Sequence, residues 1–171
     1  MRTRSLLPLV LAAVCVCLVG ASVASAATPR LSKAQWAAYT KAHTPYLAQT
    51  TKTVARFRKC RQGTAYTSYL KAFAACLGTT PHAEALATNM LFNTLHGFQG
   101  KVRGNCAKSL TTYQTALYFW RSVVVGIDRA VKQTTSSVST VEGQVQNGVL
   151  AAQRVNTDAT LFTGACKPLA I

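Results

Sequence analysis

The sequence predicts an all-α protein, a four- to five-helix bundle with a long C-terminal antiparallel helical hairpin and two disulfides. Three observations favour this fold. Apolar residues recur at steps of three and four along most of the chain. Capping residues, prolines and glycines divide that pattern into five segments. Four cysteines remain after an N-terminal leader, an even number that is typical of exported proteins with disulfides.

The first 26 residues have the composition of a secretory signal peptide. Arg2 and Arg4 form a basic start, an apolar run covers residues 6–19, and Ala-Ser-Ala at 24–26 supplies small residues for cleavage. A retained anchor is disfavoured because the apolar run is shorter than a membrane span. We expect cleavage near Ala26 and a mature chain, residues 27–171, that forms a single helical domain. The protein is expected to be secreted or to reside in the periplasm or cell envelope.

The first predicted helix covers residues 32–60. Ser32 and Gln35 form a capping box at its start. Pro45 predicts a kink or a restart capped by Thr44, because proline lacks an amide hydrogen. The predicted buried face follows helical spacing and consists of Trp36, Tyr39, His43, Tyr46 or Leu47, Thr50, Val54, Phe57 and Cys60.

Two shorter helices are predicted next, at residues 65–77 and 81–97. Gly78 ends the former, while Thr80 is the predicted cap of the latter and Pro81 its first helical residue. Glu84 is expected near the positive end of that third helix. The predicted buried faces are Tyr66, Tyr69, Leu70, Phe73 and Leu77 in the second helix, and Leu86, Met90, Leu91, Leu95 and Phe98 in the third.

The last third of the chain has the most regular apolar pattern, a heptad seam from Cys106 to Val131 that resumes from Val138 to Cys166. One long rod and two helices folded back on each other both fit this seam. The cysteines favour the hairpin, because both are thirty residues from a turn near Ser136. A rod would hold them ~90 Å apart. We expect helices at residues 105–133 and 138–163.

The hairpin predicts the disulfide pairing. Cys106 pairs with Cys166, and elimination then leaves Cys60 with Cys76. The latter two cysteines lie near the ends of successive helices. Residues 61–66 are therefore expected to run extended, so that the bond can close.

Three aromatic residues lie together in the fourth predicted helix. Trp120 is on the seam and is expected in the core. Tyr118 and Phe119 flank it, and exposure of both would make a contact patch. In a multi-helix bundle we expect them to pack against the first three helices instead.

The mature chain is strongly basic, with 17 basic and four acidic residues and a net charge of +13. Nine of the basic residues lie between Ala27 and Ala83, where no acid occurs. We name the densest group the basic collar: Lys52, Arg56, Arg58, Lys59 and Arg61. Two interpretations stay open. The collar is an anion-binding site, or it is a solvated helix end whose cations interact with the partial negative charge of the last turn.

These patterns favour a noncatalytic binding or structural protein that associates with anionic cell-envelope polymers or lipid headgroups. Tyr39, His43 and Tyr46 share a helical face and give the alternative, a carrier of a small ligand such as haem in an inter-helix pocket. An enzyme of unknown class is the second alternative, although no nucleophile elbow or paired carboxylates occur. No metal, resident cofactor or specific nucleic-acid partner is expected, because the sequence carries none of the corresponding motifs.

Overall fold

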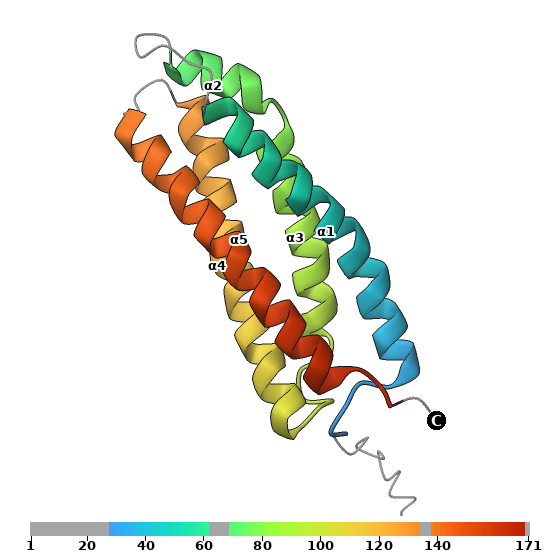
Figure 1. Ribbon diagram of the computed structural model, residues 1–171. Coiled ribbons are helices and arrows are strands. Elements are labelled where there is room, and N and C mark those ends of the chain that lie inside the picture. The colour runs from blue at the N-terminus through green and yellow to red at the C-terminus, as the bar shows by residue number, and fades with distance from the viewer. Residues whose placement is uncertain (1–27, 62–68, 134–137, 170–171) are drawn as a thin grey trace, which may run out of the picture.

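The computed structural model describes residues 28–61, 69–133 and 138–169, and four long helices run alternately up and down in it (Figure 1). A fifth, short helix lies at one end of the bundle. The helices are α1 (Lys33–Arg61), α2 (Tyr69–Leu77), α3 (Thr80–His96), α4 (Gly104–Lys132) and α5 (Val138–Cys166). The predicted helical bundle with its C-terminal hairpin is confirmed. Helix α4 packs most extensively on α5, whereas α1 and α5 make few contacts.

Helix α1 begins at the predicted capping box. The Ser32 amide donates to Oε1 of Gln35 at 2.8 Å, and the Gln35 amide donates to Oγ of Ser32 at 3.2 Å. Of the two outcomes predicted at Pro45, a kink or a restart, the restart is wrong, since α1 continues through this residue. The Thr44 hydroxyl donates to the Thr40 carbonyl instead of capping a new helix. Proline removes a single backbone donor, which a long helix with a buried face can tolerate.

The predicted seam of the hairpin forms much of the core. Its fully buried members include Leu117, Trp120, Val124 and Ile127 on α4 and Val141, Phe162 and Cys166 on α5. Gly148 lets the two helices approach closely. A Cβ atom added there would lie 3.3 Å from Cγ1 of Val123 and 3.5 Å from Cζ3 of Trp120. The absence of a side chain at this position therefore sets how near α5 lies to α4.

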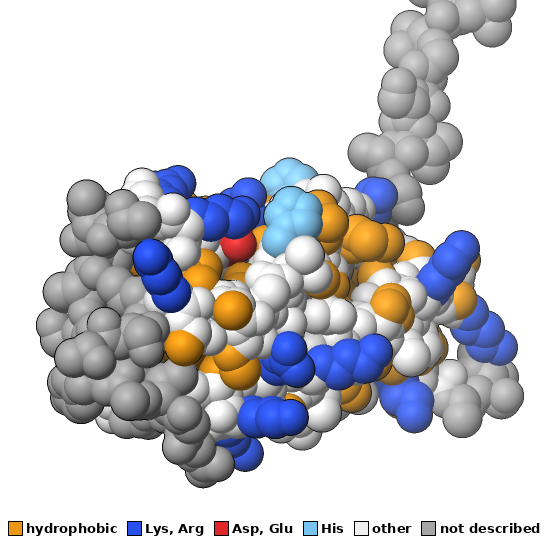
Figure 2. All heavy atoms as spheres, turned by 90° about the horizontal axis from the view of Figure 1, so that it is seen from above, with side chains coloured by type: hydrophobic (Ala, Val, Ile, Leu, Met, Phe, Trp, Pro, Cys, Tyr) orange, Lys and Arg blue, Asp and Glu red, His pale blue; other side chains and the backbone are white. Residues whose placement is uncertain are grey.

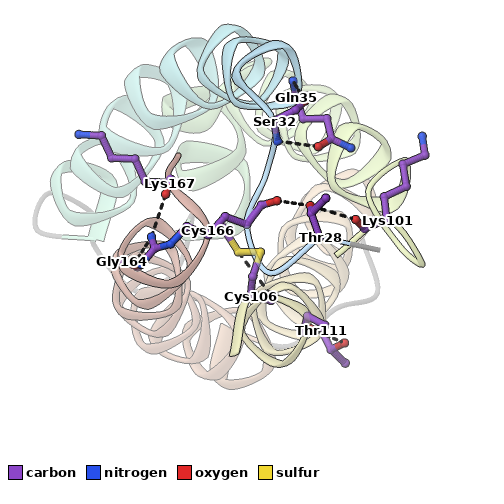
Figure 3. Close-up of a disulfide and its surroundings, with 11 residues drawn as sticks. Thr28, Ser32, Gln35, Lys101, Cys106, Thr111, Gly164, Cys166 and Lys167 are labelled. Atoms are coloured by element: carbon purple, nitrogen blue, oxygen red, sulfur yellow. Dashed lines mark hydrogen bonds between the residues drawn. A yellow bond between two sulfur atoms is a disulfide. The ribbon is translucent and has the colours of Figure 1, made fainter. Parts of the chain in front are cut away.

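Both predicted disulfides are confirmed, and they close opposite ends of the bundle. Cys60 and Cys76 join the ends of α1 and α2, with Cα atoms 5.6 Å apart. Cys106 and Cys166 join the start of α4 to the end of α5, with Cα atoms 4.8 Å apart (Figure 3). Arg61 is still helical. The rest of the path predicted to run extended, and the predicted signal peptide, lie outside the described residues.

The segment before α1 is bonded to the end of α5 and to the start of α4, which lie at the same end of the bundle (Figure 3). The Leu31 amide donates to the Cys166 carbonyl at 3.0 Å, and Arg30 donates from its guanidinium to the Lys167 carbonyl at 2.8 Å. The Arg103 amide donates to the Thr28 carbonyl at 2.8 Å. The bonds from Leu31 and Arg30 use carbonyls at the end of α5, where no helical partner is left for them, and the bond to Thr28 joins the same segment to the start of α4.

Helix α3 presents a different face to the core from the predicted one. Leu91 and Leu95 are buried as expected, but Leu86 and Met90 are 52% and 63% exposed. Glu84 and Thr88 are fully buried in their place. Apolar periodicity misjudged this helix because two polar residues occupy interior positions, where hydrogen bonds satisfy them.

The prediction that Tyr118 and Phe119 pack against the first three helices is also wrong, as their side chains are 62% and 51% exposed. Tyr113, Leu117 and Trp120 occupy the interior at helical spacing. Because successive residues point about 100° apart around a helix, the two aromatic residues between Leu117 and Trp120 turn outward.

Candidate functional site

The basic collar divides between two sides of α1. Lys52, Arg56 and Lys59 line a groove of about 500 Å³ between α1 and the start of α3. Arg58 lines a different groove, between α1 and α5. The helical period explains this division, since steps of four and three keep the first three residues on one flank, whereas Arg58 points about 200° away from Arg56. The side chain of Arg61 lies outside the described residues.

The groove between α1 and α3, here named the basic groove, has no acidic residue in its lining. Its other lining residues are Gln49, Ala55, Thr79, Thr80 and Ala83. The predicted cap at Thr80 is wrong by one residue, since α3 begins at Thr80 and Thr79 precedes it without a side-chain capping bond. The start of a helix carries partial positive charge, which adds to the charge of the three basic side chains, although Pro81 in this first turn has no amide hydrogen to donate.

The three cations of the basic groove differ in how they are held. Arg56 donates from Nε to the carbonyl of Cys76, in the last turn of α2, at 2.6 Å. A cation beside the C-terminal end of a helix is favourable, so Arg56 has a structural role. Lys52 and Lys59 form no hydrogen bond or ion pair with any described residue, and both are exposed. These two ammonium groups are free to meet an anion.

Little of the positive charge is neutralised within the described part of the chain. The ion pairs there are Lys132 with Asp128 at 2.7 Å and Arg154 with Asp158 at 3.8 Å, each within one helix. Helices α1 and α2 contain no acid. Figure 2 shows Lys and Arg side chains spread among uncharged ones over the visible face, and not gathered in one patch. The molecule therefore presents a broad positive potential.

The groove between α1 and α5, here named the apolar groove, has a volume of about 400 Å³. Leu47 and Val54 line it from α1, and Val149 and Ala152 from α5. Arg58 is the charged residue of its lining. A cavity of about 20 Å³ adjoins it and shares four of its lining residues: Leu47, Thr50, Ala152 and Asn156.

The structure brings Tyr39, His43 and Tyr46 together beside that small cavity. The ring of His43 lies 5.0 Å from that of Tyr39 and 6.2 Å from that of Tyr46. Both tyrosines are buried, and Tyr39 packs edge-on against Phe162 at 5.0 Å. Burial lowers the pKa of His43 and raises the pKa of Tyr39.

This packing limits what the three residues can hold. A space of about 20 Å³ accommodates about one water molecule, far less than a tetrapyrrole. The rings contact each other and the core instead of lining an open pocket. The haem-carrier alternative stays a prediction, and the volume at this site does not favour it.

The interior holds a carboxylate whose environment the sequence did not reveal. Glu84 is fully buried. Its Oε1 accepts hydrogen bonds from Nε1 of Trp120 at 2.6 Å and from Oγ1 of Thr50 at 2.7 Å. Its Oε2 accepts from Oγ1 of Thr53 at 2.9 Å. Burial raises the pKa of Glu84, while the hydrogen bonds from Thr50, Trp120, Thr53 and Thr88 oppose that rise.

A sequence signal for this cluster exists. Glu84 and Thr88 lie at helical spacing with Leu91 and Leu95, so the four residues share one face of α3. A face that mixes hydroxyl and carboxyl groups with leucines indicates a buried polar network. Apolar residues alone do not reveal it.

The described acids do not form a catalytic pair. Glu84 lies among hydroxyl and indole donors, and Asp128 and Asp158 each pair with a cation on their own helix. The side chain of Glu142 lies outside the described residues. Over the same part of the chain, no group of three or more His, Cys, Asp or Glu residues could hold a metal ion.

Comparison of the chain with protein-family models, with curated proteins and with solved structures found no match.

The two disulfides indicate an oxidising extracellular or envelope environment. None of the helices in the described ranges is both long enough and apolar enough to cross a membrane.

Proposed function

We propose that this protein is a noncatalytic exported protein that binds anionic cell-envelope polymers or lipid headgroups through its basic groove. The observation that carries the proposal is the groove itself. It holds the ammonium groups of Lys52 and Lys59, which have no partner among the described residues, with Arg56 alongside, and none of the described lining residues is acidic. The predicted signal peptide and the two disulfides support export.

Phosphate is the anion that this groove suits best. Lysine binds phosphate as a mobile point charge, and a helix start offers backbone amides to the same group. The hydroxyls of Thr79 and Thr80 add donors beside the start of α3. A polymer or membrane that repeats this anion gains from several weak contacts at once. The scattered cations outside the groove then contribute attraction without specificity.

The test uses the oxidised mature protein, residues 27–171, with two ligands in separate arms. One ligand is a poly(glycerol phosphate) polymer, and the other is vesicles of phosphatidylglycerol in phosphatidylcholine. Binding is measured at low and at physiological salt. It should weaken sharply between them, because the screening length falls from about 30 Å at 0.01 M salt to about 8 Å at 0.15 M. The ligand that binds with the higher affinity, polymer or vesicle, identifies the source of the anion.

The decisive variant is Lys52→Glu with Lys59→Glu. Its matched control is Lys33→Glu with Lys41→Glu, which changes the charge equally at exposed positions on the same helix, outside the basic groove. We expect a loss of tenfold or more for the groove variant and a clearly smaller loss for the control. Equal losses, binding that ignores salt, or no binding to either ligand would overturn the proposal.

A further inference from the structure

The apolar groove is a space that helix packing leaves open on the side of α1 away from the basic groove. Helices α1 and α5 make few contacts, although they are neighbours in the bundle. The resulting volume of about 400 Å³ falls in the range of small-molecule sites, roughly 300–1,000 Å³. Leu47 and Val54 expose apolar surface to it from α1, and Val149 does so from α5.

Among the described residues, the lining of this groove carries a single charge. That charge is Arg58, and none of the other described lining residues is acidic. The guanidinium of Arg58 makes no hydrogen bond or ion pair with a described residue, and the side chain is exposed. A guanidinium matches a carboxylate through two parallel hydrogen bonds. The groove is therefore complementary to a ligand with a single anionic group.

The two ends of the apolar groove differ. Arg58 is eleven residues beyond Leu47, about 16 Å along the axis of α1. The opposite end adjoins the small cavity at His43, where burial lowers the pKa of the imidazole and so favours its neutral form. Between the ends, the Thr50 hydroxyl already donates to the buried Glu84 at 2.7 Å. One end thus carries charge, and the remainder is lined by apolar side chains together with the uncharged polar side chains of Thr51, Gln153 and Asn156.

We propose that the apolar groove binds a free fatty acid, with its carboxylate on Arg58 and its single acyl chain along Leu47, Val54, Val149 and Ala152 towards His43. The chain covers the apolar walls that the packing of α1 and α5 leaves exposed. The carboxylate pairs with the cation at the other end. This site is separate from the basic groove, and its occupation does not depend on the polymer or membrane proposed above.

The experiment is calorimetric titration of the oxidised mature protein with laurate and decanoate below their micellar concentrations, and with dodecanol as a ligand that lacks the charge. Laurate should bind more tightly than decanoate, by about fourfold for each added methylene that the groove buries. Dodecanol should bind more weakly than laurate. No saturable binding of laurate, or equal affinities for laurate and decanoate, would overturn the proposal.

Two adjacent residues provide matched variants. Arg58→Glu reverses a charge in the apolar groove, and Lys59→Glu makes the same charge change in the basic groove. Both positions are exposed, so both variants should fold. Laurate affinity should fall tenfold or more in Arg58→Glu and less than threefold in Lys59→Glu, whereas dodecanol should not distinguish them. Equal losses of laurate affinity would mean unspecific attraction to a cationic protein and would refute the site.

A filling variant tests the walls independently of charge. Ala152→Phe should abolish laurate binding, while Ala38→Phe, at an exposed position of α1 outside the groove, should leave it unchanged. Circular dichroism establishes that both variants are folded. Retained laurate binding in folded Ala152→Phe would contradict the proposal. Substitution of Lys52 and Lys59 should weaken polymer binding, whereas substitution of Arg58 or Ala152 should not. The polymer proposal and the fatty-acid proposal can therefore be refuted independently.

Discussion

The indole Nε1 of Trp120 on α4 donates a hydrogen bond of 2.6 Å to the carboxylate of Glu84 on α3, inside the bundle. Thr50 and Thr53 reach the same carboxylate from α1. A buried carboxylate without a cation is costly unless its oxygens are hydrogen-bonded. The carboxylate therefore links three helices, and two of its donors are hydroxyls on α1.

Folding stability should fall as pH rises above about 4.5, the ordinary pKa of a glutamate, because of Glu84. Burial raises the pKa of Glu84 in the folded state, so the folded protein binds a proton more tightly than the unfolded chain. The contribution of the protonated group is complete below 4.5 and is lost as pH rises through the folded pKa. Glu84→Gln should remove this dependence. Urea unfolding at a series of pH values measures it, and parallel profiles for the two proteins would contradict it.

Removal of one hydroxyl donor to Glu84 should destabilise the protein. Thr53→Val keeps the shape of the side chain but leaves Oε2 of the buried carboxylate without its hydrogen bond. We expect the free energy of unfolding to fall by about 1–3 kcal/mol. Thr51→Val, at an exposed position on the same helix, should change it by about 0.5 kcal/mol or less. Chemical denaturation measures the free energy of unfolding of both variants, and an equal change in the two would argue against the hydrogen-bond network around Glu84.

Loss of the disulfide between Cys106 and Cys166 should cost about 4 kcal/mol in the chain-entropy model, because it closes a long loop. Replacement of Cys60 and Cys76 by serine should cost less, about 3 kcal/mol, because that loop is shorter. Thermal unfolding of the two double-serine variants shows which disulfide contributes more to stability. Peptide mapping of the unreduced protein checks the pairing, and a free thiol at Cys106 or Cys166 would contradict it.

Gly148 should not tolerate a large side chain, because Val123 and Trp120 lie against it. Gly148→Leu would force α4 and α5 apart, and we expect a loss of about 1–3 kcal/mol from overpacking. Gly143 is an exposed glycine on the same helix with no neighbour within 4 Å of an added Cβ. Gly143→Ala should stabilise α5 by about 0.5–1 kcal/mol. The denaturant midpoints of the Gly148→Leu and Gly143→Ala variants measure these changes. An unchanged midpoint for Gly148→Leu would contradict the close approach of α4 and α5.

Local and covalent features were readable from the sequence. The capping box at Ser32, the glycine stop at Gly78 and the regular seam from Cys106 onward each depend on a few neighbouring residues. The hairpin followed from the equal distances of Cys106 and Cys166 from the turn, because a disulfide requires Cα atoms within about 7 Å. Fold class and disulfide pairing therefore needed no knowledge of how the helices are rotated.

The sequence by itself determined the helices, their antiparallel hairpin, the sulfur bonds and the excess of positive charge. Tertiary structure decided which way each helix faces. It buried Glu84 in place of Leu86 and Met90, placed Arg58 in a different groove from Arg56, and left space between α1 and α5. The physical reason is that rotation and spacing of helices minimise the free energy of all their contacts together, and a polar residue can be interior only where partners from other helices satisfy it.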